Sequence, residues 1–379
     1  MKRNLNIDIL KVLCMYMIVV IHFFTHGLYN ELHPIPIGNL FAGVVGLNYF
    51  LSELCLLISS VAVNCFVMIT GFFLIRKSPR GNRIFSLWVE VFFYSITIAV
   101  VFYLLIPSQE HLRAIIKALT PIRNMEYWFA TKYLALMALA PFLRRLVQFI
   151  SKKEYILLLV VMGFLNLNFV STPALLRNFP YGDIYGGPDS LLWFVFLFLF
   201  SGFVSLYKEE LFCRKYLFKF KYYIFVVIAF FFWTITLEFL MAIQSGFIGS
   251  MGYQYNGLEF MVSVALFLYF VTAKLRVNSN ILRKISKWVP YTFAVYLIHD
   301  HPCMDNLIWH SYIDWNHIFS SYYFLPFMFC YTLIIFFICI IIDYFRKSIF
   351  SFMRIDLLIC RISSLLENKL LGMLYGRKG

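Results

Sequence analysis

Four ionisable side chains interrupt the first apolar segment of the chain, residues 7–27: Asp8, Lys11, His22 and His26. At about 100° per residue, an α-helix brings all four onto one stripe. Ionisable groups inside a membrane span are energetically costly, so they usually face a bundle interior or a wet cavity and mark a functional path. A neutral imidazole on such a path can act as a general base or as a nucleophile. The spacing therefore predicts a first helix that carries chemistry.

A purely structural interpretation of the stripe also stays open. Asp8 and Lys11 lie near one end of the segment, where long polar side chains can snorkel to the membrane–water interface. The two histidines would then only cap the opposite end. We favour the functional interpretation, because the stripe keeps its polar groups on one face over the whole segment.

The composition excludes a water-soluble globule, with 61% hydrophobic and only 14% charged residues and a mean hydropathy of +0.78. Long apolar runs recur, whereas the alternating strands of a membrane β-barrel do not. We predict an all-α, polytopic membrane bundle of about ten transmembrane helices. The predicted spans are residues 6–27, 46–75, 84–107, 127–143, 155–171, 190–207, 222–243, 258–273, 288–300 and 322–343.

The distribution of cations predicts the orientation of these spans. With the N-terminus inside, cytoplasmic segments hold 27 of the 33 Lys and Arg residues and outer loops hold four. This bias predicts that both termini are cytoplasmic. The same rule explains the net charge of +14, so we expect contact with anionic lipids and no nucleic acid.

The ends of the chain divide it into two predicted parts. Residues 1–347 form one membrane domain, whose first span is too long, and too polar at Asp8 and Lys11, to be a cleaved signal peptide. Residues 348–379 form a cytoplasmic tail that reads as an amphipathic helix. This tail either lies on the inner membrane surface or contacts another subunit, as in a homodimer. Only Cys303 of the eight cysteines falls in an outer loop, so we expect no disulfide and no metal site.

A second cationic feature, Arg80 and Arg83, is predicted at the inner mouth between the second and third spans. The planar guanidinium suits phosphate oxygens. Lys11 and His22 are about 16.5 Å apart along a helix axis. Together these groups describe a ligand with phosphates at the cytoplasmic end and a long, thin reactive arm, which is the shape of an acyl-coenzyme A. Plain positive-inside usage is the alternative explanation of the two arginines.

Five segments of the chain resemble, in the same order, the membrane acyltransferase family 3, which includes the O-antigen and capsule O-acetylases. The segments are residues 6–11 with His22, 63–72, 80–83, 127–129 with Leu134 and Pro141, and 291–299. The chain departs from the family pattern at three positions, where Lys11 replaces Arg, Thr70 replaces Ser and Asn64 stands where Asp is frequent.

The resemblance implies transfer of an acyl group, with acetyl expected, from cytoplasmic acyl-coenzyme A across a bacterial cytoplasmic membrane. The implied acceptor is a hydroxyl of a cell-surface or lipid-linked glycan. His22 is then the catalytic histidine, as general base or acyl carrier, on the stripe with Asp8 and Lys11. The implied donor-binding residues are Lys11, Arg80 and Arg83. Apart from the resemblance, we expect the acceptor site to be bordered by His299 and His301, at the outer end of the ninth span, together with Glu126 and Trp128. Capping at the membrane interface is the alternative for these residues.

A transporter or flippase for a lipid-linked glycan is the competing interpretation, because a helical bundle with a charged internal stripe also fits that function. A flippase does not require a phosphate-binding arginine pair aligned with Lys11 and His22. The remaining polar residues within spans are expected to be helix–helix hydrogen-bond partners; they are Asn64, Glu90, Lys132, Glu238, Glu259 and Asp343.

Overall fold

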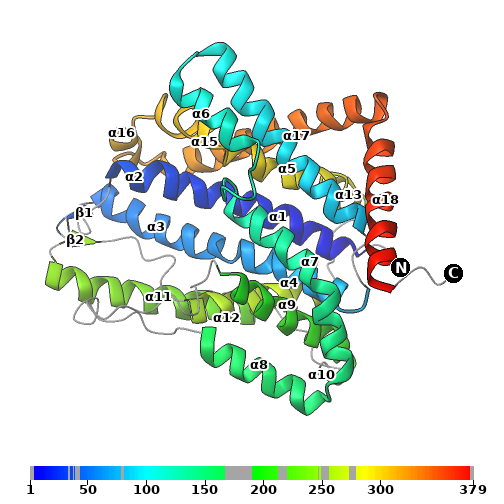
Figure 1. Cartoon of the computed structure of the whole chain (residues 1–379). Helices are drawn as coiled ribbons and strands as arrows, with labels where there is room; N and C mark the ends of the chain where they lie inside the picture. Colours follow the sequence, from blue (N-terminus) through cyan, green and yellow to red (C-terminus); the bar gives the residue numbers. More distant parts are fainter. Residues whose placement is uncertain are drawn as a thin grey trace.

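The computed structural model of the chain describes residues 4–32, 35–36, 38, 43–77, 81–166, 190–211, 220–245, 247–248, 256–272 and 279–375 (Figure 1). The first elements are α1 (Leu5–His22), the π-helix η1 (Phe23–Leu28), α2 (Tyr29–Leu32), β1 (Ile35–Pro36), α3 (Gly43–Ser60), α4 (Ala62–Leu74), α5 (Gly81–Leu105) and α6 (Gln109–Ala118). They are followed by α7 (Trp128–Phe149), α8 (Lys152–Asn166), α9 (Leu191–Leu206), α10 (Lys208–Leu211), α11 (Phe220–Ser245), β2 (Phe247–Ile248), α12 (Asn256–Thr272) and α13 (Ser279–Ser286). The last are the 3₁₀ turn η4 (Val289–Tyr291), α14 (Thr292–His299), α15 (Pro302–Asp305), the π-helix η5 (Asn306–His310), α16 (Trp315–Phe319), α17 (Phe324–Phe352) and α18 (Ile355–Tyr375).

The described residues form an all-α membrane protein, as predicted. A helix coincides with each of the ten predicted spans, and β1 and β2 form a single two-residue antiparallel ladder. Four stretches are long and apolar enough to cross a bilayer: Leu5–Leu28, Gly43–Leu74, Arg83–Leu105 and Phe324–Phe352. The apolar helices Leu191–Leu206, Phe220–Thr236 and Glu259–Thr272 are shorter. The full number of crossings and the inward orientation of the termini stay predictions.

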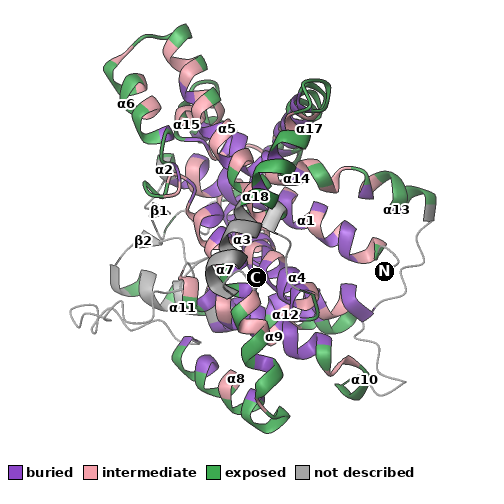
Figure 2. Cartoon of the chain, turned by 45° about the vertical axis from the view of Figure 1, so that its right-hand side comes forward, coloured by how far each residue is buried: buried purple, intermediate pink, exposed green. Residues whose placement is uncertain are grey.

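The first helix lies in the middle of the bundle. Within the apolar 18-residue stretch of this first helix, 78% of the residues are buried inside the protein. The corresponding shares for α5 and α17 are only 22% and 33%. Figure 2 shows the same contrast between a mostly buried α1 and a largely exposed α17. Apolar side chains on the outside of α5 and α17 fit contact with lipid. Of the polar stripe, Asp8 and His22 are therefore buried inside the protein, whereas Lys11 and His26 are half-buried.

The predicted first span changes its helical geometry partway. Asn4 caps the N-terminus of α1, because its side chain accepts hydrogen bonds from the backbone N–H groups of Asn6 and Ile7. The α-helix ends at His22 and continues as the wider π-helix η1. The prediction of one regular α-helix over residues 7–27 was therefore wrong beyond His22. A π-helical turn redirects the side chains that follow it, and such turns are frequent at functional sites.

Small residues allow two core helices to approach closely. A Cβ atom on Gly71 would lie 2.3 Å from the carbonyl oxygen of Phe198 on α9, which is far inside van der Waals contact. Only glycine therefore permits the observed packing of α4 against α9. This contact fixes the position of α4 relative to α9. Residues of α4 line both cavities described below.

Buried polar groups tie the helices together, as predicted for several of them. On α17, Arg346 donates to Asp343 at 2.6 Å and to Glu90 of α5 at 3.0 Å. The hydroxyl of Tyr94 donates to the same Asp343 carboxylate at 2.8 Å. Both hydrogen bonds to Asp343 go to Oδ1, while Oδ2 has no hydrogen-bond partner and lies 3.4 Å from Nζ of Lys347. The positive charges offset part of the cost of burying these carboxylates. The side chain of Glu238 lies outside the described residues.

The C-terminal helix α18 runs across the end of the bundle at which the N-terminus lies (Figure 1). It packs against α5 and α17. The turn that separates it from α17 contains Arg354 with a φ of 58°. Because α17 continues to Phe352, the predicted domain boundary after residue 347 falls inside this helix.

Candidate active site

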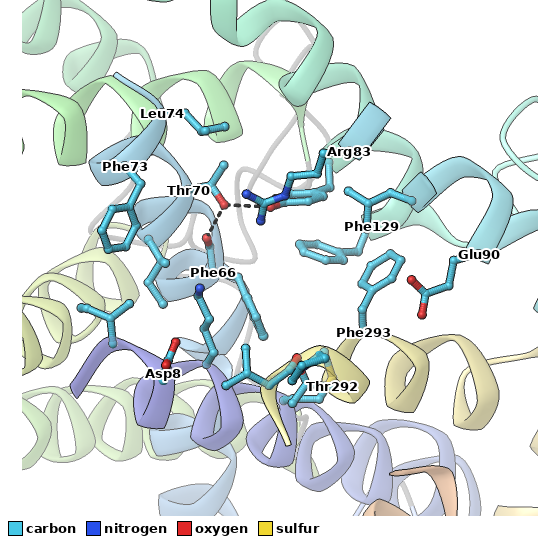
Figure 3. Close-up of a pocket in the computed structure, with 18 of the residues that line it drawn as sticks. Asp8, Phe66, Thr70, Phe73, Leu74, Arg83, Glu90, Phe129, Thr292 and Phe293 are labelled. Carbon is cyan, nitrogen blue, oxygen red and sulfur yellow. Dashed lines mark hydrogen bonds between the residues drawn. The ribbon is translucent and has the colours of Figure 1, made fainter. Parts of the chain in front are cut away.

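A cavity of about 520 Å³ opens beside the N-terminal half of α1. Its polar lining includes three of the residues predicted from the sequence, Asp8, Lys11 and Arg83. Figure 3 shows Asp8, Arg83 and Glu90 spaced around this cavity. Arg83 is exposed, as a group at a cavity mouth must be to meet a soluble ligand. Arg80 lies outside the described residues.

The walls of this first cavity are mostly apolar. Phe66, Phe73 and Phe293 lie on different sides of it (Figure 3). The Lys11 ammonium lies 6.0 Å from the centre of the Phe73 ring. The cavity therefore combines cationic side chains with an apolar wall, which suits a ligand that has both a charged head and an apolar arm.

A second cavity of about 50 Å³ lies beside His22. Trp128, predicted for the acceptor side, lines it together with Asn64 and Glu259. The Trp193 indole N–H donates to Asn64 Oδ1 at 2.9 Å, and the Asn64 amide donates to Glu259 Oε1 at 3.0 Å. These bonds cross between α9, α4 and α12, and they fix the polar wall opposite the imidazole.

His299 holds the ring of His22. Nδ1 of His299 is in hydrogen-bonding distance of the carbonyl oxygen of Val295, and a carbonyl only accepts, so this nitrogen carries a hydrogen. In the neutral ring, Nε2 of His299 is then an acceptor. Nδ1 of His22 lies 2.9 Å from it and must be the donor. Two adjacent imidazolium ions would repel each other, so we take both rings as neutral. His22 Nε2 therefore keeps its lone pair.

Asp300 lies beside the same histidine. One of its carboxylate oxygens is 3.4 Å from Nδ1 of His22 and 3.5 Å from Nε2 of His26. His26 follows His22 on the π-helix η1, and the centres of the two rings are 4.7 Å apart. A buried carboxylate at this distance stabilises an imidazolium that forms during a reaction. The sequence analysis missed Asp300; the signal was the polar run from His299 to His301 at the end of an apolar segment.

On its other ring nitrogen, His26 bonds a second carboxylate. Its Nδ1 is 3.0 Å from Asp305, and this hydrogen bond lowers the pKa of Asp305 below its ordinary value. His22, His26 and Asp300 are the described groups that could ligate a metal ion, with one donor atom from each within 4.8 Å of the others.

Glu126 and His301 form a separate cluster that lines neither cavity. Ser95 donates to Glu126 at 2.6 Å, and His301 Nε2 lies 3.4 Å from the same carboxylate. The backbone N–H of Cys303 donates to His301 Nδ1 at 3.0 Å. Burial lowers the pKa of His301 to about 4 and raises the pKa of Glu126. This cluster joins α5 to the segment after α14.

The structure thus distributes the predicted site residues over three places. Asp8, Lys11 and Arg83 line the first cavity, whereas His22 and Trp128 line the second. His299 bonds His22 from behind without lining either cavity. Glu126 and His301 contact each other instead of His22.

Comparison with known families assigns this architecture. A family model described as an acyltransferase domain matches residues 4–344, nearly the whole chain. No curated protein and no solved structure matches the chain. The matched residues include the lining of both cavities and the histidines that surround His22. The chain belongs to the membrane acyltransferase family 3.

Proposed function

We propose that this protein transfers an acetyl group from cytoplasmic acetyl-coenzyme A to a hydroxyl of a cell-surface or lipid-linked glycan. The observation that carries the proposal is the orientation of His22, whose Nδ1 is bonded to His299 and whose ring borders a small internal cavity. An acyltransferase needs a base at such a place, and family membership supports acyl transfer.

The first cavity is the proposed donor site. Lys11 and Arg83 supply positive charge for the phosphates, and Arg80, three residues before Arg83 in the sequence, is proposed to assist. The pantetheine arm would lie along the apolar wall made by Phe66 and Phe293. Lys11, one turn after Asp8, provides a point charge instead of the bidentate fork of an arginine.

The reaction at His22 balances without a further co-reactant. The acceptor hydroxyl oxygen attacks the thioester carbon while its proton moves to Nε2 of His22. The carbon–sulfur bond breaks, and the proton is then delivered to the departing thiolate, which leaves as free coenzyme A. Asp300 stabilises the transient imidazolium through the Nδ1 side of the ring.

The same lone pair supports an acyl-histidine route. Nε2 of His22 would attack the thioester carbon, coenzyme A would leave, and the glycan hydroxyl would then take the acyl group. A burst of coenzyme A release without acceptor, equal to the amount of enzyme, indicates this route. Release that depends on acceptor indicates direct transfer.

The size of the second cavity supports a small acyl group. Its volume of about 50 Å³ is far below the 520 Å³ of the first cavity, so it favours a short acyl chain such as acetyl over a longer one. Trp128 and Asn64 on the cavity wall are proposed to receive the acceptor hydroxyl, with the rest of the sugar outside this cavity.

The proposed setting is a bacterial cytoplasmic membrane, with the donor bound from the cytoplasm and the acceptor from outside. Metal chemistry has no part in the proposal. The transport alternative is not proposed, because the family that matches the chain is one of acyltransferases.

Thermal unfolding of the purified protein with and without coenzyme A tests the donor site. We expect a rise in the unfolding temperature that saturates with ligand, together with transfer of labelled acetyl groups to glycan in membranes from expressing cells. No stabilisation by coenzyme A and no labelled glycan would contradict the proposal.

A further inference from the structure

Phe129 of α7 is the one residue that lines both cavities among the residues the structure describes. The first cavity holds the donor-site cations and the second holds His22. Any thioester that enters from the cytoplasmic side must therefore pass this ring before it reaches the imidazole. The relationship depends on the proposed function, which assigns the two cavities to one reaction.

The helices around Phe129 pass from the first cavity to the second at the same height along the bundle. On α1, Met15 lines the first cavity and Ile18 the second, about 4.5 Å farther along the axis. On α4, the same change occurs between Phe66 and Asn64. The two cavities thus follow one another along the bundle, with Phe129 where they meet.

The third helix of the lining, α14, passes from one cavity to the other at the same height. On α14, Phe293 lines the first cavity and Tyr296 the second. Aromatic rings from α4, α7 and α14 therefore gather at the boundary. Figure 3 shows Phe129 and Phe293 on the same side of the first cavity.

The Phe129 ring is held from both sides of the division. It stacks on Tyr133 with ring centres 5.5 Å apart and packs edge-on against Tyr296 at 5.6 Å. The Tyr133 hydroxyl is itself fixed by a 2.9 Å hydrogen bond to Thr70. The side chain of Phe129 is only 3% exposed. Its packing therefore holds this ring at the boundary between the two cavities.

We propose that Phe129 determines which acyl groups this enzyme transfers, by separating the donor cavity from the His22 cavity and limiting the space beyond it. The cavity beyond the ring is the smaller of the two, about 50 Å³ against about 520 Å³, so it favours a two-carbon over a four-carbon acyl group. The same closure keeps water in the donor cavity away from His22, and so protects the thioester from hydrolysis.

Replacing the ring by a smaller side chain enlarges the space next to His22. Phe129→Leu removes part of the barrier and Phe129→Ala removes most of it. The matched control is Phe194→Leu, because Phe194 packs against Phe129 with ring centres 5.8 Å apart but lines neither cavity. Loss of aromatic packing is similar in the two leucine variants, so a difference between them reports the barrier.

The experiment compares acetyl-, butyryl- and succinyl-coenzyme A as donors for the purified parent and the three variants, with and without acceptor. We expect Phe129→Leu to raise the ratio of butyryl to acetyl transfer by about tenfold, since a methylene in a hydrophobic site changes discrimination by at least that factor. Hydrolysis of the donor without acceptor should also rise. Phe194→Leu should leave both quantities within about twofold of the parent.

An unchanged butyryl-to-acetyl ratio in both Phe129 variants, with transfer retained, would overturn the proposal. So would loss of transfer from every donor in Phe129→Leu while Phe194→Leu stays active, because the ring would then position the substrate and not exclude one. A parent protein that transfers no acyl group from any of the donors contradicts the proposed function instead.

Discussion

Nδ1 of His22 lies 2.9 Å from Nε2 of His299, across 277 residues of sequence. The bond of His299 to the Val295 carbonyl sets the direction of this contact, so that His22 donates and His299 accepts. The backbone of α14 thereby decides which nitrogen of the first helix is basic. A neutral histidine with the opposite tautomer has no lone pair to offer at Nε2.

This relationship makes His299 a positioning residue whose role depends on an acceptor atom. In His299→Gln, the side-chain oxygen can take the place of Nε2 and accept from His22, so we expect most of the activity to remain. In His299→Leu this acceptor is removed and only the Asp300 oxygen, 3.4 Å from Nδ1 of His22, remains, so kcat should fall about a hundredfold or more because His22 loses its orientation. Steady-state transfer rates with saturating donor measure both. Equal losses in the two variants would indicate a packing role only.

Lys11 tests the charge of the donor cavity. Lys11→Arg keeps a cation of similar reach and should retain substantial activity, whereas Lys11→Met keeps the length but removes the charge and should lose most of it. Donor affinity, measured by titration calorimetry, should fall in the methionine variant. If Lys11→Met behaves like the parent, the proposed path from the phosphates to His22 is wrong.

The double variant Lys11→Met with Asp8→Asn separates two roles of this lysine. Both side chains line the first cavity. Recovery of activity in the double variant would mean that Lys11 mainly balances the charge of Asp8. Continued loss together with weak donor binding would mean that Lys11 acts on the donor itself.

Arg80 and Arg83 are expected to bind phosphate. Replacing both with Gln should weaken binding of coenzyme A about tenfold or more, and should weaken binding of dephospho-coenzyme A less, because charge-assisted hydrogen bonds to the extra phosphate are lost only in the first case. Competition binding with the two nucleotides gives both values. Equal losses for the two ligands would assign the arginines to membrane topology.

The cluster of Glu126 and His301 predicts a dependence of stability on pH. Burial lowers the pKa of His301 to about 4. Between about pH 6.5 and 4, this histidine is therefore protonated in the unfolded chain but stays neutral in the folded protein. Stability from this group is present above that window and is lost as the pH falls through it, on the order of 3 kcal/mol in total. The raised pKa of Glu126 acts in the opposite direction and offsets part of the loss.

The variant His301→Gln should therefore unfold with a weaker dependence on acidification than the parent. Thermal unfolding midpoints between pH 7.5 and 4.5 provide the comparison. His310→Gln is the control, because His310 bonds Glu31 at 2.9 Å in a more exposed pair. Parallel curves for the parent and His301→Gln would show that this ring does not govern acid sensitivity.

The sequence was sufficient to predict the helical segments, because apolar length and hydropathy are local properties. It also placed Asp8, Lys11 and His22 on an internal path, since their spacing falls within one helix. However, the α-helix ends at His22 and a π-helix follows it. A π-helical turn cannot be inferred from a periodicity that assumes about 100° per residue.

Contacts between distant segments could not be predicted in the same way. Nothing local in the ninth predicted span, residues 288–300, indicates that His299 bonds His22 while the following His301 faces Glu126. The role of Phe129 was equally hidden, because an aromatic residue in an apolar helix is ordinary. Only the packing of α1, α4, α7 and α14 places it between two cavities.

The most direct test of the central claim is acetyl transfer by purified protein in proteoliposomes, comparing the parent with His22→Ala. Labelled acetyl-coenzyme A is supplied on the cytoplasmic side with a glycan extract as acceptor, and protein amounts and coenzyme A binding are matched beforehand. We predict that His22→Ala still binds coenzyme A but transfers acetyl groups at least about 10³-fold more slowly than the parent. Transfer by His22→Ala at a rate near that of the parent would contradict the account.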